Sequence, residues 1–247
     1  MESSPQRLQK LLAQAGLCSR RQAETLLRQG RVEVNGQTAQ LGDRADPERD
    51  RICLDGAPIR GTAEALILLL HKPAGVVSSC FDPEGRATVL DLLPQEISRG
   101  TGLHPVGRLD SESRGALLLT NRGELTLRLT HPRYGHEKTY RIWVEGRPGA
   151  ESLERWRQGL PLDGEPSQPV RVRPLAERSG RTQLELVMVE GRNRQIRRTA
   201  LALGHRVLDL ERVAIGPIRL GDLPEGRWRR VGPEEWGDLD PLGRGAP

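Results

Sequence analysis

The chain has 247 residues, more than one ordinary domain usually needs, so two domains are expected. Its longest wholly apolar run, residues 65–70, is far shorter than the ~20 residues of a membrane-spanning helix, and residues 1–9 lack the apolar core of an export signal. We therefore expect a cytoplasmic protein that is not inserted in a membrane, and the net charge of +5 favours an anionic partner such as nucleic acid.

The sequence lacks recognisable metal and cofactor motifs. Cys18, Cys53 and Cys80 are odd in number and too far apart for a zinc or redox pair, which favours a reducing compartment. The five histidines show no metal-ligand spacing, and no glycine-rich loop resembles those that hold nucleoside triphosphates or dinucleotides. We expect a reaction without metal, nucleotide cofactor or any other cofactor.

In chain order, the first expected elements are two short helices followed by short strands. Apolar residues recur at helical spacing over residues 8–15, and residues 19–22 have the form of a capping box that begins a second helix. Residues 32–36 then alternate into an Asn-Gly pair, which is typical of a tight hairpin, and a similar strand and turn follow at residues 52–56. These elements predict a small module over residues 1–60.

Basic residues crowd this module, where Glu24 is the only acidic residue between positions 7 and 31. The candidate RNA contacts are Arg7, Lys10, Arg20, Arg21, Arg28 and Arg31. A solvated helical face would explain the same charges, and this alternative stays open. The two helices and the hairpin resemble the S4-like RNA-binding domain of ribosomal proteins and RNA-modifying enzymes, and this resemblance implies RNA binding without implying catalysis.

A polar linker at residues 61–64 leads into a larger domain expected over residues 65–237, and residues 238–247 are expected to be a disordered tail. Strands are predicted at residues 66–70, 116–120, 139–144, 170–172 and 183–189, and helices near residues 123–129, 153–158 and 195–203. Strands and helices do not alternate regularly. The order predicts an α+β domain whose mixed, largely antiparallel sheet is flanked by helices.

The most informative segment is the G-R-L-D loop, in which Asp110 precedes a predicted strand. By itself Asp110 fits a turn or a helix cap, because aspartate favours such positions. Three other motifs accompany it, namely H-K-P-A-G at residues 71–75, E-K-T-Y at 137–140 and E-G-R-N-R-Q-I-R-R at 190–198. In this order and spacing, the four motifs resemble the RsuA/RluB/RluE/RluF family of ribosomal RNA pseudouridine synthases.

The resemblance implies an isomerisation in which the uracil is detached from its ribose, rotated and rejoined through carbon. Asp110 matches the essential aspartate of the family, which acts either as a nucleophile or by helping to remove a sugar proton. Arg197 matches the basic residue of the family, and we expect it to hold the Asp110 carboxylate ionised through paired hydrogen bonds, with a phosphate contact as the alternative. Tyr140 matches the strand tyrosine, expected to stack on the uracil and to relay a proton, with a core aromatic as the alternative.

Further RNA contacts are expected around these catalytic candidates, from Lys72, Arg108, Arg192, Arg194 and Arg198. Arg194, Arg197 and Arg198 are expected to form one positive helical face, and Arg108 to fill the gap left by a base that leaves the stack. A solvated turn residue is the alternative for Lys72.

The segments 194–198 and 206–217 look more like family members that act on large-subunit RNA. The expected partner is therefore 23S ribosomal RNA or a large-subunit assembly intermediate, bound by a monomer, with 16S ribosomal RNA as the alternative. A non-catalytic ribosome-assembly factor would not need Asp110, Tyr140 and Arg197 together. A glycosidase would need a second carboxylate paired with Asp110, and none is evident.

Overall fold

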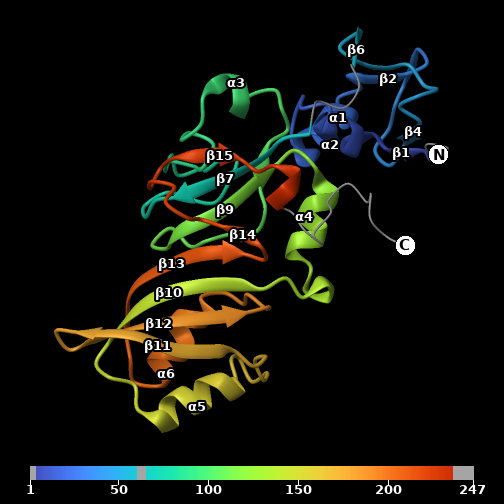
Figure 1. Ribbon diagram of the computed structural model, residues 1–247. Helices are drawn as coiled ribbons and strands as arrows, with labels where there is room; N and C mark the ends of the chain where they lie inside the picture. Colours follow the sequence, from blue (N-terminus) through green and yellow to red (C-terminus); the bar gives the residue numbers. More distant parts are fainter. Residues whose placement is uncertain (1–3, 60–64, 236–247) are drawn as a thin grey trace. The chain divides into compact units, whose positions relative to one another are not determined.

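The computed structural model describes residues 4–59 and 65–235, which fall into two compact units (Figure 1). The first unit comprises Met1–Ile67, Leu93–His104 and Leu119–Gly123, and the second comprises Leu68–Leu92, Pro105–Leu118 and Glu124–Pro247. The predicted linker at 61–64 and the predicted tail at 238–247 lie outside the described residues. The expected domain boundaries stay predictions.

The first unit begins with the two predicted helices, α1 (Leu8–Gln14) and α2 (Arg20–Arg28). The capping box is confirmed, since the Ser19 hydroxyl accepts a hydrogen bond from the backbone N–H of Gln22, whose side chain accepts one from the N–H of Ser19. The apolar faces of both helices, with Leu12 and Leu27 among their buried residues, pack into one small core.

The hairpins of the first unit also form where the sequence predicts them. Asn35 and Gly36 take φ angles of 54° and 81° in the turn of the first hairpin, the left-handed region that an Asn-Gly turn uses. The four-stranded sheet runs in the order β3 (Gln37–Thr38), β2 (Val32–Val34), β5 (Ile52–Leu54), β6 (Ala57–Pro58). A separate pair joins β1 (Gln6–Arg7) to β4 (Arg44–Ala45).

The segment Leu93–His104, which carries the short helix α3 (Gln95–Ser98), belongs to the first unit. Its backbone approaches the backbone of residues 13–16 closely at two glycines. A Cβ atom on Gly16 would lie 2.2 Å from the carbonyl oxygen of Gly100, and one on Gly102 would lie 2.7 Å from that of Ala13. Only glycine permits these backbones to approach so closely.

The second unit is built on a nine-stranded sheet whose main path is β11-β12-β10-β13-β9-β7-β15. The strands are β7 (Ile67–Lys72), β8 (His104–Pro105), β9 (Arg114–Thr120), β10 (Lys138–Glu145), β11 (Arg171–Arg178), β12 (Arg181–Met188), β13 (Val207–Ile215), β14 (Ile218–Arg219) and β15 (Trp228–Arg230). β10 pairs antiparallel with both β12 and β13, whereas β13 pairs parallel with β9. The expected mixed, largely antiparallel sheet is confirmed.

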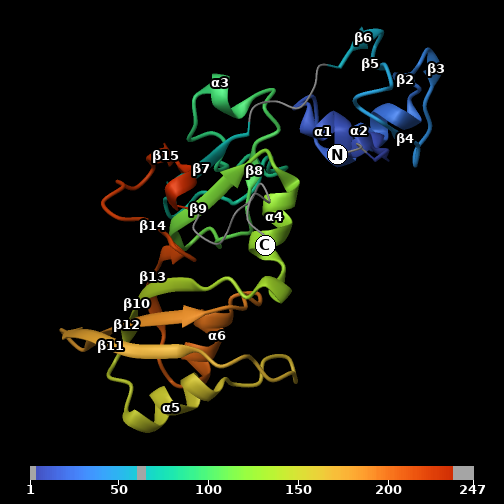
Figure 2. The same ribbon diagram turned by 45° about the vertical axis from the view of Figure 1, so that its right-hand side comes forward.

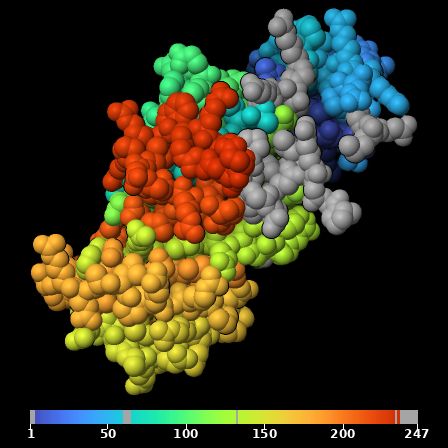
Figure 3. All heavy atoms as spheres, in the orientation of Figure 1, coloured from blue at the N-terminus to red at the C-terminus, as the bar shows by residue number. Residues whose placement is uncertain are grey.

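The helical elements of this unit are α4 (Gly123–Thr130), α5 (Ala150–Gln158), α6 (Gln195–Ala202) and the short 3-10 turns Pro132–Tyr134 and Pro233–Glu235. Side chains of α5 and α6 share one apolar core with β10, β12 and β13. Both helices lie next to this part of the sheet in two views (Figures 1 and 2). The part of the chain coloured yellow to orange, which includes α5, β11 and β12, forms a continuous region on the face shown in Figure 3.

Candidate active site

A cavity of about 460 Å³ in the second unit contains all three residues predicted to be catalytic. Asp110 contributes from the loop before β9, Tyr140 from β10 and Arg197 from α6, so the fold brings together three segments that are far apart in the chain. Arg108, Arg192 and Arg194 also line this cavity. Because basic side chains outnumber acidic ones on its wall, the cavity favours an electron-rich ligand.

The loop that carries Asp110 is fixed by its backbone. The Asp110 carbonyl accepts a hydrogen bond from the Ser113 N–H at 3.0 Å, which closes a turn directly after the carboxylate. On the other side, the Ser78 hydroxyl donates to the Leu109 carbonyl at 2.8 Å and accepts from the Leu109 N–H at 3.1 Å. These contacts leave the half-buried Asp110 side chain at the cavity wall.

The expected RNA contact of Lys72 is contradicted by its burial. Its side chain is fully buried, and the ammonium donates to the backbone carbonyls of Pro73, Ser111 and Ser113 at 2.8, 3.3 and 2.7 Å. Burial lowers the pKa of Lys72 to about 8, although the nearby Asp110 charge opposes this shift. Lys72 is therefore an internal support of the Asp110 loop.

Arg197 lines the cavity, but it does not grip Asp110 as expected. Among the residues that the structure describes, no ion pair joins these two side chains. Arg197 instead donates to the Glu112 carbonyl at 3.5 Å and to the Ser113 hydroxyl at 3.3 Å, and it stays mostly buried. Because the loop turns at Ser113, the guanidinium reaches the residues that follow the carboxylate.

The expected positive face of α6 is divided between two acidic partners. Arg194 donates to Glu112 at 2.9 Å, and this hydrogen bond is the main reason that the pKa of Glu112 is lowered. Arg198 forms two hydrogen bonds with Asp163, at 3.0 and 2.6 Å, and lowers the pKa of that carboxyl. Arg194 stays at the cavity, whereas Arg198 is not among the lining residues.

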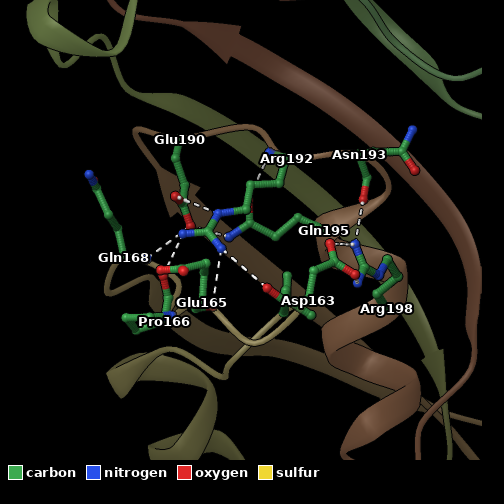
Figure 4. A network of polar contacts seen from close by, with 10 residues as sticks. Asp163, Glu165, Pro166, Gln168, Glu190, Arg192, Asn193, Gln195 and Arg198 are labelled. Carbon is green, nitrogen blue, oxygen red and sulfur yellow. Dashed lines mark hydrogen bonds and ion pairs between the residues drawn. The ribbon is translucent and has the colours of Figure 1, made fainter.

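Arg192 lies at the centre of a polar network that joins two loops (Figure 4). It pairs with Glu190 at 3.3 Å and donates to the carbonyls of Leu162, Glu165 and Pro166. Gln195 adds a 2.5 Å hydrogen bond to Glu190. The network ties residues 162–166 to the segment that leads into α6, so Arg192 has a structural role as well as a place on the cavity wall.

Tyr140 is both a core residue and a cavity residue. It is 7% exposed, belongs to the apolar cluster around α5 and α6, and still lines the cavity. In the sheet register Tyr140 faces Leu186 on β12 and Arg212 on β13. Within the described part of the chain, its hydroxyl makes no hydrogen bond, so the group is available to a ligand.

The basic residues predicted on the S4-like module all belong to the first unit. Arg7, Arg20, Arg21, Arg28 and Arg31 are exposed, and Lys10 is half-buried. Arg31 is already engaged, since it forms two hydrogen bonds with Asp55 at 2.8 and 2.6 Å. For Arg20, Arg21 and Arg28 on α2, the described residues provide no acidic partner within ion-pair distance.

The cavity is also lined by Lys138, Leu210 and Arg212, none of which was predicted from the sequence as a site residue. β13 was not predicted as a strand, because charged residues interrupt its apolar pattern. The signal for this strand is that Leu210, Arg212 and Ala214 are spaced two residues apart, as residues on one face of a strand are, and all three are buried.

Two family models match the chain and define its class. The model described as RNA pseudouridylate synthase matches residues 66–202, and the S4 domain model matches residues 6–52.

The described residues contain no group of three or more histidine, cysteine or acidic side chains placed to hold a metal ion. Among the described helices, none is long and apolar enough to cross a membrane.

Relatives of similar length share this class. An uncharacterised RNA pseudouridine synthase of Aquifex aeolicus is 39% identical over 94% of this chain and 93% of its own length. Ribosomal large subunit pseudouridine synthase B of Bacillus subtilis is 38% identical over 93% of each chain. A crystal structure of a pseudouridylate synthase superimposes with a TM-score of 0.69 at 30% identity, covering 94% of this chain and 99% of the other. The protein thus belongs to the RNA pseudouridylate synthase family and carries an S4 domain.

Proposed function

We propose that this protein converts a specific uridine of 23S ribosomal RNA into pseudouridine, with Asp110 as the essential carboxylate. The observation that carries the proposal is the meeting of Asp110, Tyr140 and Arg197 in one cavity of a chain that belongs to the pseudouridine synthase family. The large-subunit substrate is supported by the Bacillus subtilis relative, which is named a ribosomal large subunit pseudouridine synthase. The similarity to this relative covers 93% of its length. The corresponding reaction on 16S ribosomal RNA remains the second candidate.

The reaction breaks the bond between ribose C1′ and uracil N1 and forms a bond between C1′ and C5. The C5 proton is lost and N1 gains a proton, so the change is redox-neutral. Asp110 acts at the sugar or base as the uracil detaches, and the Tyr140 ring lies against the uracil with its hydroxyl placed to move the C5 proton. A cavity wall rich in cations stabilises the electron pair that stays on the departing base.

Arg197 acts in this proposal as a positioning residue. Its hydrogen bonds to Glu112 and Ser113, together with those of Lys72 to Ser111 and Ser113, fix the loop that presents the carboxylate. Its charge also lies on the cavity wall, where it adds to the attraction for an electron-rich ligand.

RNA is held in two places in the proposed complex. The α2 residues Arg20, Arg21 and Arg28 contact phosphates through the S4 domain, and Arg108 and Arg194 contact RNA at the cavity. The target base must leave its stack to reach Asp110, and the exposed Arg108 beside the loop can occupy the gap. The protein acts as a cytoplasmic monomer without a cofactor.

The test is chemical mapping of pseudouridine in purified large-subunit and small-subunit ribosomal RNA transcripts after incubation with the protein. One modified uridine in the 23S transcript is expected, and the Asp110→Asn variant should leave it unmodified. Modification of the 16S transcript alone would overturn the substrate assignment. If incubation with the protein produces no pseudouridine in either transcript, nor in ribosomal assembly intermediates purified from cells lacking the gene, the proposed activity is overturned.

A further inference from the structure

Arg212 is a buried cation on the cavity wall to which the mechanism above assigns no individual role. It is 3% exposed, and its Nε atom donates to the Ala116 carbonyl at 2.7 Å. Its Nη2 atom is buried and has no hydrogen-bond partner among the residues that the structure describes. A buried donor without a partner costs about 1–3 kcal/mol, so its presence requires a reason.

The strand register places Arg212 between the other elements of the site. It faces Tyr140 on the antiparallel strand β10 and Gly115 on the parallel strand β9. Side chains that face each other across an antiparallel pair lie on the same side of the sheet, so Arg212 and Tyr140 are neighbours. A Cβ atom at Gly115 would lie 2.3 Å from the Arg212 carbonyl oxygen, which shows how closely β13 approaches the strand that follows the Asp110 loop.

The charges around Arg212 do not account for its burial. Within the described chain, no carboxylate lies within ion-pair distance of it. Its near neighbours include two other cations, Lys72 and Lys138, and Arg212 contributes to the lowered pKa of both. A buried cation without a counter-charge is unfavourable in the empty site, which favours a ligand that supplies an electron-rich oxygen.

The uracil supplied by the proposed function has two such oxygens. When the C1′–N1 bond breaks, the electron pair that remains on the base is shared with O2 and O4, so a cationic donor binds the detached base better than the neutral one. A backbone phosphate fits less well, because Arg212 is 3% exposed and lies on a strand inside the sheet. We propose that Arg212 donates a hydrogen bond to one carbonyl oxygen of the target uracil. This inference rests on the proposed function.

The test combines one change in the protein with one change in the RNA. Single-turnover conversion is measured on RNA fragments that carry uridine, 2-thiouridine or 4-thiouridine at the mapped target, because sulfur accepts hydrogen bonds poorly. In the unmodified protein, one of the two thio substitutions should slow conversion about 10-fold or more, as loss of a hydrogen bond from a charged donor predicts. In Arg212→Met, uridine should react about 10- to 100-fold more slowly, and that thio penalty should disappear.

A matched control is Arg141→Met, which removes an exposed arginine from the strand that also carries Tyr140. It should keep both the uridine rate and the thio penalty. Arg212→Gln keeps a hydrogen-bond donor for the Ala116 carbonyl but lacks the charge and the length of the guanidinium, and it replaces Arg212→Met if loss of the Ala116 contact prevents folding. Thio penalties that are absent in the unmodified protein, or unchanged in the folded Arg212 variant, would overturn the inference. Failure of the unmodified protein to convert uridine would instead overturn the proposed function.

Discussion

Asp110 owes its position to contacts made by the residues on either side of it. Ser78 holds Leu109, Lys72 holds Ser111 and Ser113, and the turn closes between Asp110 and Ser113. Among these contacts, no hydrogen bond depends on the Asp110 carboxylate itself. Substitutions of this side chain should therefore change the chemistry while leaving the loop in place.

Lys72 should make stability depend on pH in the alkaline range. Its pKa is about 8 in the folded protein against an ordinary 10.5, so between these values the unfolded chain retains a proton that the folded chain has lost. Raising the pH then favours the folded state, whereas below pH 8 both states are protonated and the burial penalty is constant. The difference in unfolding free energy between the unmodified protein and Lys72→Met should rise between these two pH values.

Urea denaturation at several pH values measures this difference. Arg141→Met, which alters an exposed residue, serves as the control and should show no such slope. A difference curve for Lys72→Met that is flat across the interval would show that Lys72 keeps its proton in the folded protein.

For individual residues, the sequence predicted which side chains meet at the site but not how they contact one another. The motifs predicted that Asp110, Tyr140 and Arg197 meet, and the three residues line one cavity. The contact between Arg197 and Ser113, rather than Asp110, depends on where the turn directs the backbone, and the sequence pattern does not contain that information. Lys72 was misjudged for a related reason, because its partners are carbonyls from a distant loop.

The network around Arg192 lets two elements be compared by substitution. Arg192→Met removes hydrogen bonds to three backbone carbonyls of residues 162–166, whereas Arg198→Met removes an exposed ion pair with Asp163. We expect the first variant to lose about 1–3 kcal/mol of unfolding free energy and the second less than about 1 kcal/mol. Urea denaturation and amide hydrogen exchange in residues 162–166 measure both effects. Equal losses in the two variants would contradict a structural role specific to Arg192.

Elements with a strong local signal formed where they were expected, whereas the long strand β13, which depends on tertiary contacts, was not predicted. The capping box and the Asn-Gly turn are encoded within a few residues, so α2 and the first hairpin were predictable. The charged residues Asp209, Glu211 and Arg212 interrupt the apolar pattern of β13, and the inward-facing Arg212 could be recognised only from the sheet register. Arg212 was therefore not predicted as a site residue because β13, the strand that carries it, was not predicted.

For the whole molecule, the salt dependence of RNA binding tests the role of the S4 domain. Replacing Arg20, Arg21 and Arg28 by glutamine in the full chain removes exposed charges from α2. The slope of log affinity against log salt concentration should become less steep by about 2–3 units, because binding releases fewer counterions when three phosphate contacts are lost. Conversion at saturating RNA should be unchanged, which separates binding from chemistry.

The matched control replaces three other exposed arginines of the same unit, Arg44, Arg49 and Arg51. Both triple variants change the net charge equally, so only a specific RNA surface on α2 predicts different slopes. Equal slopes, measured by filter binding over a range of salt concentrations, would reduce the role of α2 to general charge.

The two-part organisation was predictable from length and motif order, but the composition of the parts was not. Residues 93–104 belong to the first unit although they follow the first strand of the large sheet. Gly16 and Gly102 permit that close backbone approach, and a single glycine in a sequence does not reveal which backbone it will meet.

The central claim is that the Asp110 carboxylate carries out the isomerisation. It is tested most directly by tritium release from RNA labelled at C5 of uridine, measured for the unmodified protein and for Asp110→Asn under single-turnover conditions. Release by the unmodified protein and none by Asp110→Asn, with RNA affinity retained, is the expected result. Comparable release by the folded Asp110→Asn protein would contradict the claim.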